Sequence, residues 1–209
     1  MITLFHNRSG SYISLGGVYE VKNKSTTIKE ITAKVFRQSD NATLSLIWST
    51  FPSPIYRKVA GNFETSFETA HSFKVEADTL APAFVEFADK CANMDEVSNN
   101  ILYPVVCATM PIFSQPNATL PIVDGAVRAL PEYALAKIAL NDHFFWKADE
   151  YEMVITTIHS KGTFDKKYVF SLSDAESFRL RNNIDSVLVS HVANHFGIPV
   201  QVNTVAKGF

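Results

Sequence analysis

Two histidines, His191 and His195, have the spacing in this chain that most resembles a metal-binding motif. On a helix, positions i and i+4 share one face, which is the arrangement that zinc peptidases use. Those enzymes place a glutamate directly after the first histidine as the general base, and here that position holds Val192. A zinc site also needs a third ligand, for which Asp185 and His159 are the candidates.

The same two histidines support a second interpretation. In a helix they continue the apolar stripe that contains Ile184 and Leu188, so they would pack against a core or line an interface. We favour this structural role for His191 and His195. A metal-dependent hydrolase that uses the pair is the alternative.

Other motifs for catalysis are missing from the sequence. Cys107 lies in the apolar run Val105-Val106-Cys107-Ala108, whereas reactive cysteines need electropositive, partly exposed surroundings. The chain contains no G-x-S-x-G nucleophile motif, no phosphate-binding loop and no dinucleotide-binding motif. We therefore expect no cofactor. Cys91 and Cys107 could form one disulfide, but buried free thiols that pack as small apolar residues are the favoured interpretation.

Residues 101–123 contain no charged side chain, and the cores of protein interfaces are depleted of charge. This stretch predicts either a partner-binding surface or a segment buried beneath helices, and burial is slightly favoured. On the helix near residue 180, two arginines predict a solvated face or, as the minority interpretation, recognition of a partner or an anion. The candidate partner-binding residues are Tyr103, Val106, Met110, Phe113, Arg179 and Arg181.

Prolines decide what secondary structure we expect for residues 101–123. Proline removes a backbone donor and clashes with the preceding helical turn, so a continuous or membrane-spanning helix is not expected here. Edge-strand pieces and loops lying over the core are predicted instead. The four prolines are Pro104, Pro111, Pro116 and Pro121.

The elements that must position these residues are mostly strands. Residues 12–21, 28–37 and 43–51 alternate apolar and polar side chains between polar turns, which predicts an antiparallel meander. Residues 144–172 predict a β-hairpin, with Tyr151, Met153 and Ile155 facing the core on its first arm.

Two helices are predicted in the second half of the chain. Residues 131–140 begin with proline and are rich in alanine and leucine. A longer helix over residues 174–196 begins with Ser173 as the N-cap and Glu176 three residues later, which is a capping box. Gly197 ends it.

Composition limits the classes of partner. The chain of 209 residues has a net charge of −2 from 19 basic and 21 acidic residues, and neither sign is segregated. Nucleic-acid binders concentrate basic charge, so no nucleic acid is expected. The first residues contain no signal-peptide pattern, which predicts a cytoplasmic protein. Four N-x-S/T sites keep a secreted or particle-associated protein as the alternative.

One local sequence resembles a known fold. The pattern Trp146-x-Ala148-Asp149-Glu150-Tyr151-x-Met153-x-Ile155 resembles the corner and penultimate strand of immunoglobulin and fibronectin type III domains. The resemblance covers about ten residues, and Met153 stands where an antibody domain has a cysteine. It implies an antiparallel β-sandwich and leaves the function open, although such sandwiches commonly serve as binding or structural modules.

The predicted architecture is therefore mainly β: an antiparallel immunoglobulin-like β-sandwich with a helical or irregular insertion and a C-terminal helix. Residues 1–209 are expected to form one domain with the insertion at about 89–142, and two domains that divide near 90–100 are the alternative. In the one-domain arrangement Trp48 shares a core with Tyr151 or Phe170.

The function predicted first is a non-enzymatic binding or assembly module that contacts a protein partner or a second copy of itself. The second is the metal-dependent hydrolase. The third is a structural component of a larger particle.

Overall fold

The computed structural model describes residues 1–7, 10–59, 62–89, 94–115 and 117–208. For residues 52–59, 62–67 and 94–95 it describes the backbone path alone. Cys91 and Pro116, which the sequence analysis names, lie outside the described residues. The strands are β1 (Ile2–Asn7), β2 (Gly10–Val21), β3 (Thr26–Arg37), β4 (Thr43–Val59), β5 (Asn62–Thr69), β6 (Phe73–Val75), β7 (Thr79–Asp89), β8 (Asp149–His159), β9 (Gly162–Leu172) and β10 (Thr204–Lys207).

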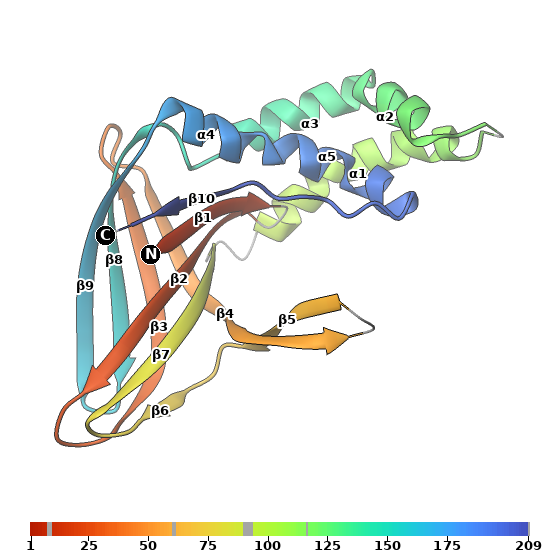
Figure 1. The fold of residues 1–209 in the computed structure, drawn as a ribbon. Helices are drawn as coiled ribbons and strands as arrows, with labels where there is room; N and C mark the ends of the chain where they lie inside the picture. Colours follow the sequence, from red (N-terminus) through yellow and green to blue (C-terminus); the bar gives the residue numbers. More distant parts are fainter. Residues whose placement is uncertain (8–9, 60–61, 90–93, 116, 209) are drawn as a thin grey trace.

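Within the described residues, the strands form one antiparallel, ten-stranded sheet that curls strongly (Figure 1). Along the sheet the order is β10-β1-β2-β7-β4-β3-β8-β9, while β5 pairs with β4 and β6 pairs with β3. β1 and β10 pair with each other, so the two ends of the chain lie side by side. The mainly β, antiparallel character predicted from the sequence is confirmed.

Period-two alternation gives the sheet one buried face, which is its concave side. In β8 every second residue from Tyr151 to Thr157 is buried, and β1 alternates in the same way from Ile2. Registers carry this pattern across strands, since Met153 pairs with Val35 and Ile155 pairs with Ala33. Apolar side chains from neighbouring strands therefore gather on one side and form the core.

The predicted hairpin at residues 144–172 is confirmed, with Asp149 to His159 of β8 paired with Gly162 to Leu172 of β9. It joins the N-terminal strands by hydrogen bonding β8 directly to β3. The meander predicted for residues 12–21, 28–37 and 43–51 is wrong at its first connection: β3 and β4 are adjacent, but β7 and β4 lie between β2 and β3 in the sheet. Trp48 and Tyr151 belong to the same cluster of buried residues. The hairpin extends the same sheet beyond β3, so the two-layered sandwich is not confirmed. The sandwich and the domain organisation remain predictions.

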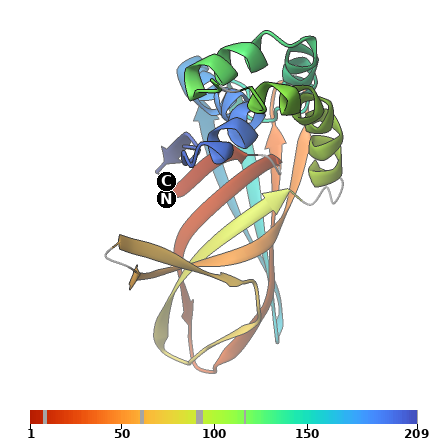
Figure 2. The ribbon, with the colours of Figure 1, turned by 90° about the vertical axis from the view of Figure 1, so that its right-hand side faces the viewer.

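Five helices are described: α1 (Met94–Phe113), α2 (Leu120–Arg128), α3 (Pro131–Asp142), α4 (Asp174–Arg181) and α5 (Asn183–His195). They gather at one end of the sheet, where α4 and α5 pack on β1 (Figure 2). The helix predicted at 131–140 and the capping box of Ser173 are confirmed. The long C-terminal helix is divided at Asn182 into α4 and α5. No helix of the described residues combines the length and apolar character needed to cross a membrane.

The extended conformation predicted for residues 101–123 is wrong, because α1 runs through Pro104 and Pro111. Both prolines are exposed, so water can reach the carbonyl groups that lose a helical donor. On the opposite side, Leu102, Val105 and Thr109 are buried at helical spacing. The burial of this face outweighs the cost of the prolines.

Two further expectations are corrected. The strand predicted at residues 43–51 does not end there, since β4 continues to Val59 and pairs with β5 as a hairpin that projects from the sheet (Figure 1). Cys107 is a free cysteine, as predicted, but it is exposed on α1 and not buried. The helical spacing turns Cys107 away from the face formed by Leu102 and Val105.

Candidate functional site

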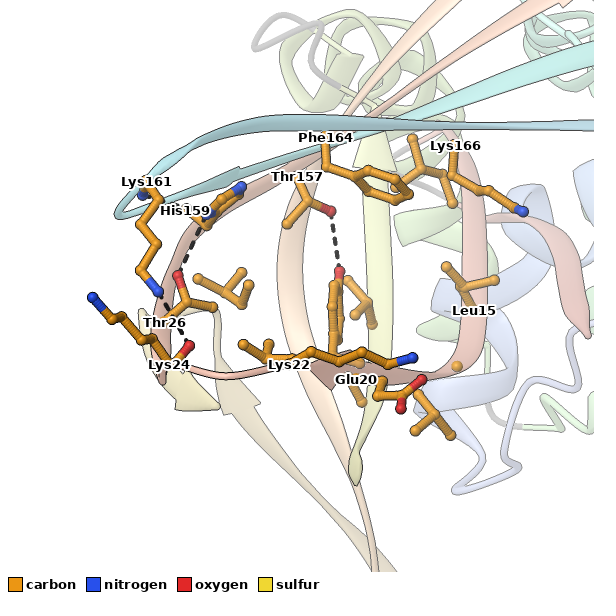
Figure 3. Close-up of a pocket in the computed structure, with 18 of the residues that line it drawn as sticks. Leu15, Glu20, Lys22, Lys24, Thr26, Thr157, His159, Lys161, Phe164 and Lys166 are labelled. Atoms are coloured by element: carbon orange, nitrogen blue, oxygen red, sulfur yellow. Dashed lines mark hydrogen bonds between the residues drawn. The ribbon is translucent and has the colours of Figure 1, made fainter. Parts of the chain in front are cut away.

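The curled sheet encloses a half-open cavity of about 630 Å³ on its concave side, at the end opposite the helices (Figure 3). Side chains from five strands, β2, β3, β7, β8 and β9, contribute to its lining. Small-molecule sites in proteins commonly measure ~300–1,000 Å³. The cavity is therefore large enough for a small organic ligand.

The walls are mainly apolar, and strand register explains why. Leu15 of β2 pairs with Val85 of β7, so both side chains point to the same side of the sheet. Ile155 of β8 lines the same cavity. Gly17 continues the β2 row, opposite Ala83. A Cβ atom added at Gly17 would meet nothing within 4 Å, so the missing side chain leaves part of this space open.

Tyr19 of β2 and Thr157 of β8 meet across the concave side of the sheet. Their hydroxyl groups lie 3.2 Å apart, which joins β2 to β8 by a hydrogen bond. Burial raises the pKa of Tyr19. It also raises the pKa of Tyr168, which lines the cavity from β9. Both phenols therefore present neutral hydroxyl groups at physiological pH.

Lysines surround the mouth of the cavity. Lys22 and Lys24 follow β2, Lys161 is in the turn between β8 and β9, and Lys166 is on β9; all four are exposed. The ammonium group of Lys161 donates to the backbone carbonyl of Lys24 at 3.1 Å, so the two turns are fastened together (Figure 3).

A second link between the same turns involves β3. The hydroxyl of Thr26 lies 3.0 Å from that of Ser160 and 3.4 Å from Nδ1 of His159. His159, named from the sequence as a possible third zinc ligand, therefore lies at the rim of the cavity.

The structure places His191 and His195 at the other end of the molecule, between α5 and α1. Nε2 of His191 is 2.9 Å from the hydroxyl of Thr109, and burial lowers the pKa of His191. The ring of His195 stacks on Phe113 at 4.3 Å between centroids. These contacts bring one predicted partner residue, Phe113, together with the predicted histidine pair.

The remaining candidate ligand for that pair, Asp185, accepts hydrogen bonds from the hydroxyl of Tyr133 at 2.8 Å and from Lys137. Across the described ranges, no three His, Cys, Asp or Glu side chains are grouped so that they could hold a metal ion. The metal-dependent hydrolase remains a prediction that the zinc content of the purified protein would test.

The other predicted partner residues lie on two helices. On α1, Tyr103 is 69% exposed and Met110 is 60% exposed, while Val106 is half-buried. On α4, Arg179 is exposed and Arg181 covers the ring of Phe144 at 5.3 Å. The uncharged stretch is thus neither wholly buried nor wholly exposed.

Sequence reasoning missed the cavity. The two signals that it offered are the Gly16-Gly17 pair, which interrupts the apolar alternation of β2, and the lysines of the turns at 22–24 and 161. Neither signal shows that β2 and β8 approach each other.

Comparisons with protein-family models, with curated proteins and with solved structures found no match for this chain. The candidate functions therefore depend on the geometry of the chain itself.

Proposed function

We propose that this protein is a non-enzymatic binding module that holds an apolar small molecule on the concave side of its sheet. The cavity of about 630 Å³ is the observation that supports the proposal. A ligand there would cover apolar walls supplied by Leu15, Val85 and Ile155. Removing apolar surface from water contributes ~25 cal/mol per Å², which is the main source of affinity for such a ligand.

The polar groups of the walls fit a binding role. Tyr19 is hydrogen-bonded to Thr157, and His159 is hydrogen-bonded to Thr26. Side chains that are held by one another keep a fixed position, so the cavity is preformed and a ligand need not order it. A few polar groups at fixed places in an apolar wall orient a ligand.

The immunoglobulin-like resemblance is part of the proposal. The hydroxyl of Tyr151 donates to the carbonyl of Lys147 at 2.6 Å, four residues upstream. Immunoglobulin-like sandwiches contain a tyrosine corner in which the hydroxyl bonds to the backbone a few residues earlier in the chain. This local bond supports a relation to those binding modules.

Filling the cavity tests the proposed function. Gly17→Trp adds a large side chain where a Cβ meets nothing, and Val169→Trp adds the same group to an exposed position on the other face of β9. The uncharged dye Nile red is the probe, and its fluorescence rises in apolar surroundings. We expect the wild-type protein and Val169→Trp to bind the dye, and Gly17→Trp to lose at least tenfold in affinity.

Thermal unfolding of both variants shows whether each is folded. Equal binding of the dye by folded Gly17→Trp and wild-type protein would contradict the proposal, as would a wild-type protein that does not bind the dye.

The second candidate function is assembly of the chain with itself through α1. Tyr103, Cys107 and Met110 are exposed at helical spacing on one face of α1. Exposed apolar groups that gather on one face are typical of protein contacts. Light scattering tests self-association, with Met110→Glu as the variant and Leu80→Glu, an exposed position on β7, as the control. A wild-type protein that is monomeric at high concentration would exclude this candidate.

A further inference from the structure

We propose that the ligand of the cavity is an amphipathic carboxylate, whose apolar chain lies along the walls and whose carboxylate meets the lysines at the mouth. This inference rests on the proposed function and names the class of ligand.

The charge around the mouth carries the inference. Among the residues that the structure describes, four lysines, Lys22, Lys24, Lys161 and Lys166, line the cavity together with one carboxylate, Glu20. The mouth is therefore positive, although the whole chain has a net charge of −2. Like charges placed together repel one another, and a bound anion relieves that repulsion.

The lysines of the mouth are available to a ligand. In the part of the chain that the structure describes, none of the four forms an ion pair with a carboxylate, whereas Lys74, Lys137, Lys167 and Lys207 do. Lys161 donates to a backbone carbonyl group, which has no negative charge to balance the ammonium group. Lys22 and Lys166 extend from opposite walls of the cavity (Figure 3).

The mouth is also fixed in place. The bond from Lys161 to the Lys24 carbonyl and the contact of Thr26 with Ser160 connect the β2–β3 turn with the β8–β9 turn. Lys22, Lys24 and Lys161 are therefore attached to two linked turns, and Lys166 is on β9, so less ordering is required when the anion binds.

The arrangement of charge and apolar surface selects an amphipathic ligand. The apolar side chains of Leu15, Val85 and Ile155 line the walls, while the ammonium groups are at the exposed rim. A small anion without a chain would leave the walls uncovered. A cationic amphiphile would meet the repulsion of four lysines.

Isothermal titration with three ligands of equal chain length tests the inference: decanoate, decan-1-ol and decyltrimethylammonium. Acetate is the control without a chain. We expect decanoate to bind about tenfold more tightly than decan-1-ol, and the cation and acetate to bind at least tenfold more weakly than decanoate. Added salt should weaken the binding of decanoate and leave that of decan-1-ol unchanged.

The variants remove two charges at a time. The first double variant, Lys22→Gln with Lys166→Gln, removes two charges at the mouth of the cavity. The control double variant, Lys34→Gln with Lys167→Gln, removes two exposed charges from the other face of the sheet. We expect the first pair to bring the affinity for decanoate down to that for decan-1-ol, and the second pair to leave it unchanged.

The outcomes separate the two proposals. If decanoate and decan-1-ol bind equally well, and Gly17→Trp abolishes both, the cavity binds apolar ligands and the carboxylate inference is wrong. If acetate binds as tightly as decanoate, the site is a simple anion site and the inference is also wrong. If no ligand with a decyl chain binds, the proposed function fails together with the inference.

Discussion

Tyr19 on β2 and Thr157 on β8 meet hydroxyl to hydroxyl at 3.2 Å, although three strands, β7, β4 and β3, separate β2 from β8 in the sheet. A flat sheet would hold these strands far apart, because neighbouring strands lie ~4.8 Å from each other. The contact therefore marks the curl of the sheet, and the cavity lies beside it.

Removing this contact should loosen the curl. We expect Tyr19→Phe and Thr157→Val each to lower the free energy of unfolding by ~1 kcal/mol, the usual net contribution of one hydrogen bond. The double variant should cost less than the sum of the two single variants, because the contact can be lost only once. Urea unfolding of the four proteins measures this, and strictly additive effects would show that the two hydroxyl groups do not interact.

Tyr151 should stabilise the corner before β8. Its hydroxyl donates to the Lys147 carbonyl at 2.6 Å, and its ring is fully buried. Tyr151→Phe keeps the ring and loses the hydrogen bond, so we expect the free energy of unfolding to fall by ~1 kcal/mol. The control is Tyr103→Phe, at an exposed position of α1, which should change the free energy of unfolding by less than ~0.5 kcal/mol. Equal losses of stability in the two variants would show that the hydrogen bond of Tyr151 does not stabilise the corner.

His6 should make the stability depend on pH. Its side chain is only 3% exposed beside Phe144, and burial lowers its pKa from 6.5 to about 4. Between these values the unfolded chain binds a proton that the folded chain does not. The free energy of unfolding should therefore fall as the pH is lowered from 6.5 toward 4, by up to ~3 kcal/mol.

His6→Leu tests this dependence. Leucine does not titrate, and in the part of the chain that the structure describes Nδ1 of His6 has no hydrogen-bond partner that the substitution would remove. Urea unfolding at a series of pH values measures how steeply the free energy of unfolding depends on pH. This dependence should be weaker in His6→Leu and unchanged in the control His143→Gln, which alters an exposed position. A pH dependence that His6→Leu does not alter would mean that His6 titrates alike in both states.

Asn183 should hold the C-terminal strand in place. It is fully buried, donates to the carbonyl of Asn203 at 2.9 Å and accepts from the amide of Asn203 at 2.7 Å, one residue before β10. We expect Asn183→Ala to cost ~2 kcal/mol, because the buried side chain loses two hydrogen bonds to the backbone of Asn203. Hydrogen exchange of the β10 amides should accelerate, whereas Asn194→Ala, at an exposed position of α5, should leave it unchanged.

The local elements could be predicted because their causes lie within a few residues of one another. The capping box of Ser173 and Glu176 joins groups three residues apart, and the β8–β9 hairpin follows from alternation along two adjacent strands. For α1 the local signal was misleading: Pro104 and Pro111 suggested an interruption, but the tertiary burial of Leu102 and Val105 supplied the energy that maintains the helix.

The candidate site required contacts between distant segments. The spacing of His191 and His195 showed that they share a face, but a third ligand would have to come from another element, and Asp185 instead binds Tyr133 and Lys137. The residues of the cavity are scattered over β2, β3, β7, β8 and β9, and no periodicity connects them.

The sequence by itself determined that the chain is mainly antiparallel β, and which side of each main strand is apolar, because period-two alternation acts on one strand at a time. Only the tertiary structure decided that β8 pairs with β3 and that the sheet curls until Tyr19 reaches Thr157. Those contacts join segments more than a hundred residues apart, so their energy depends on the packing of the whole sheet and not on any single stretch.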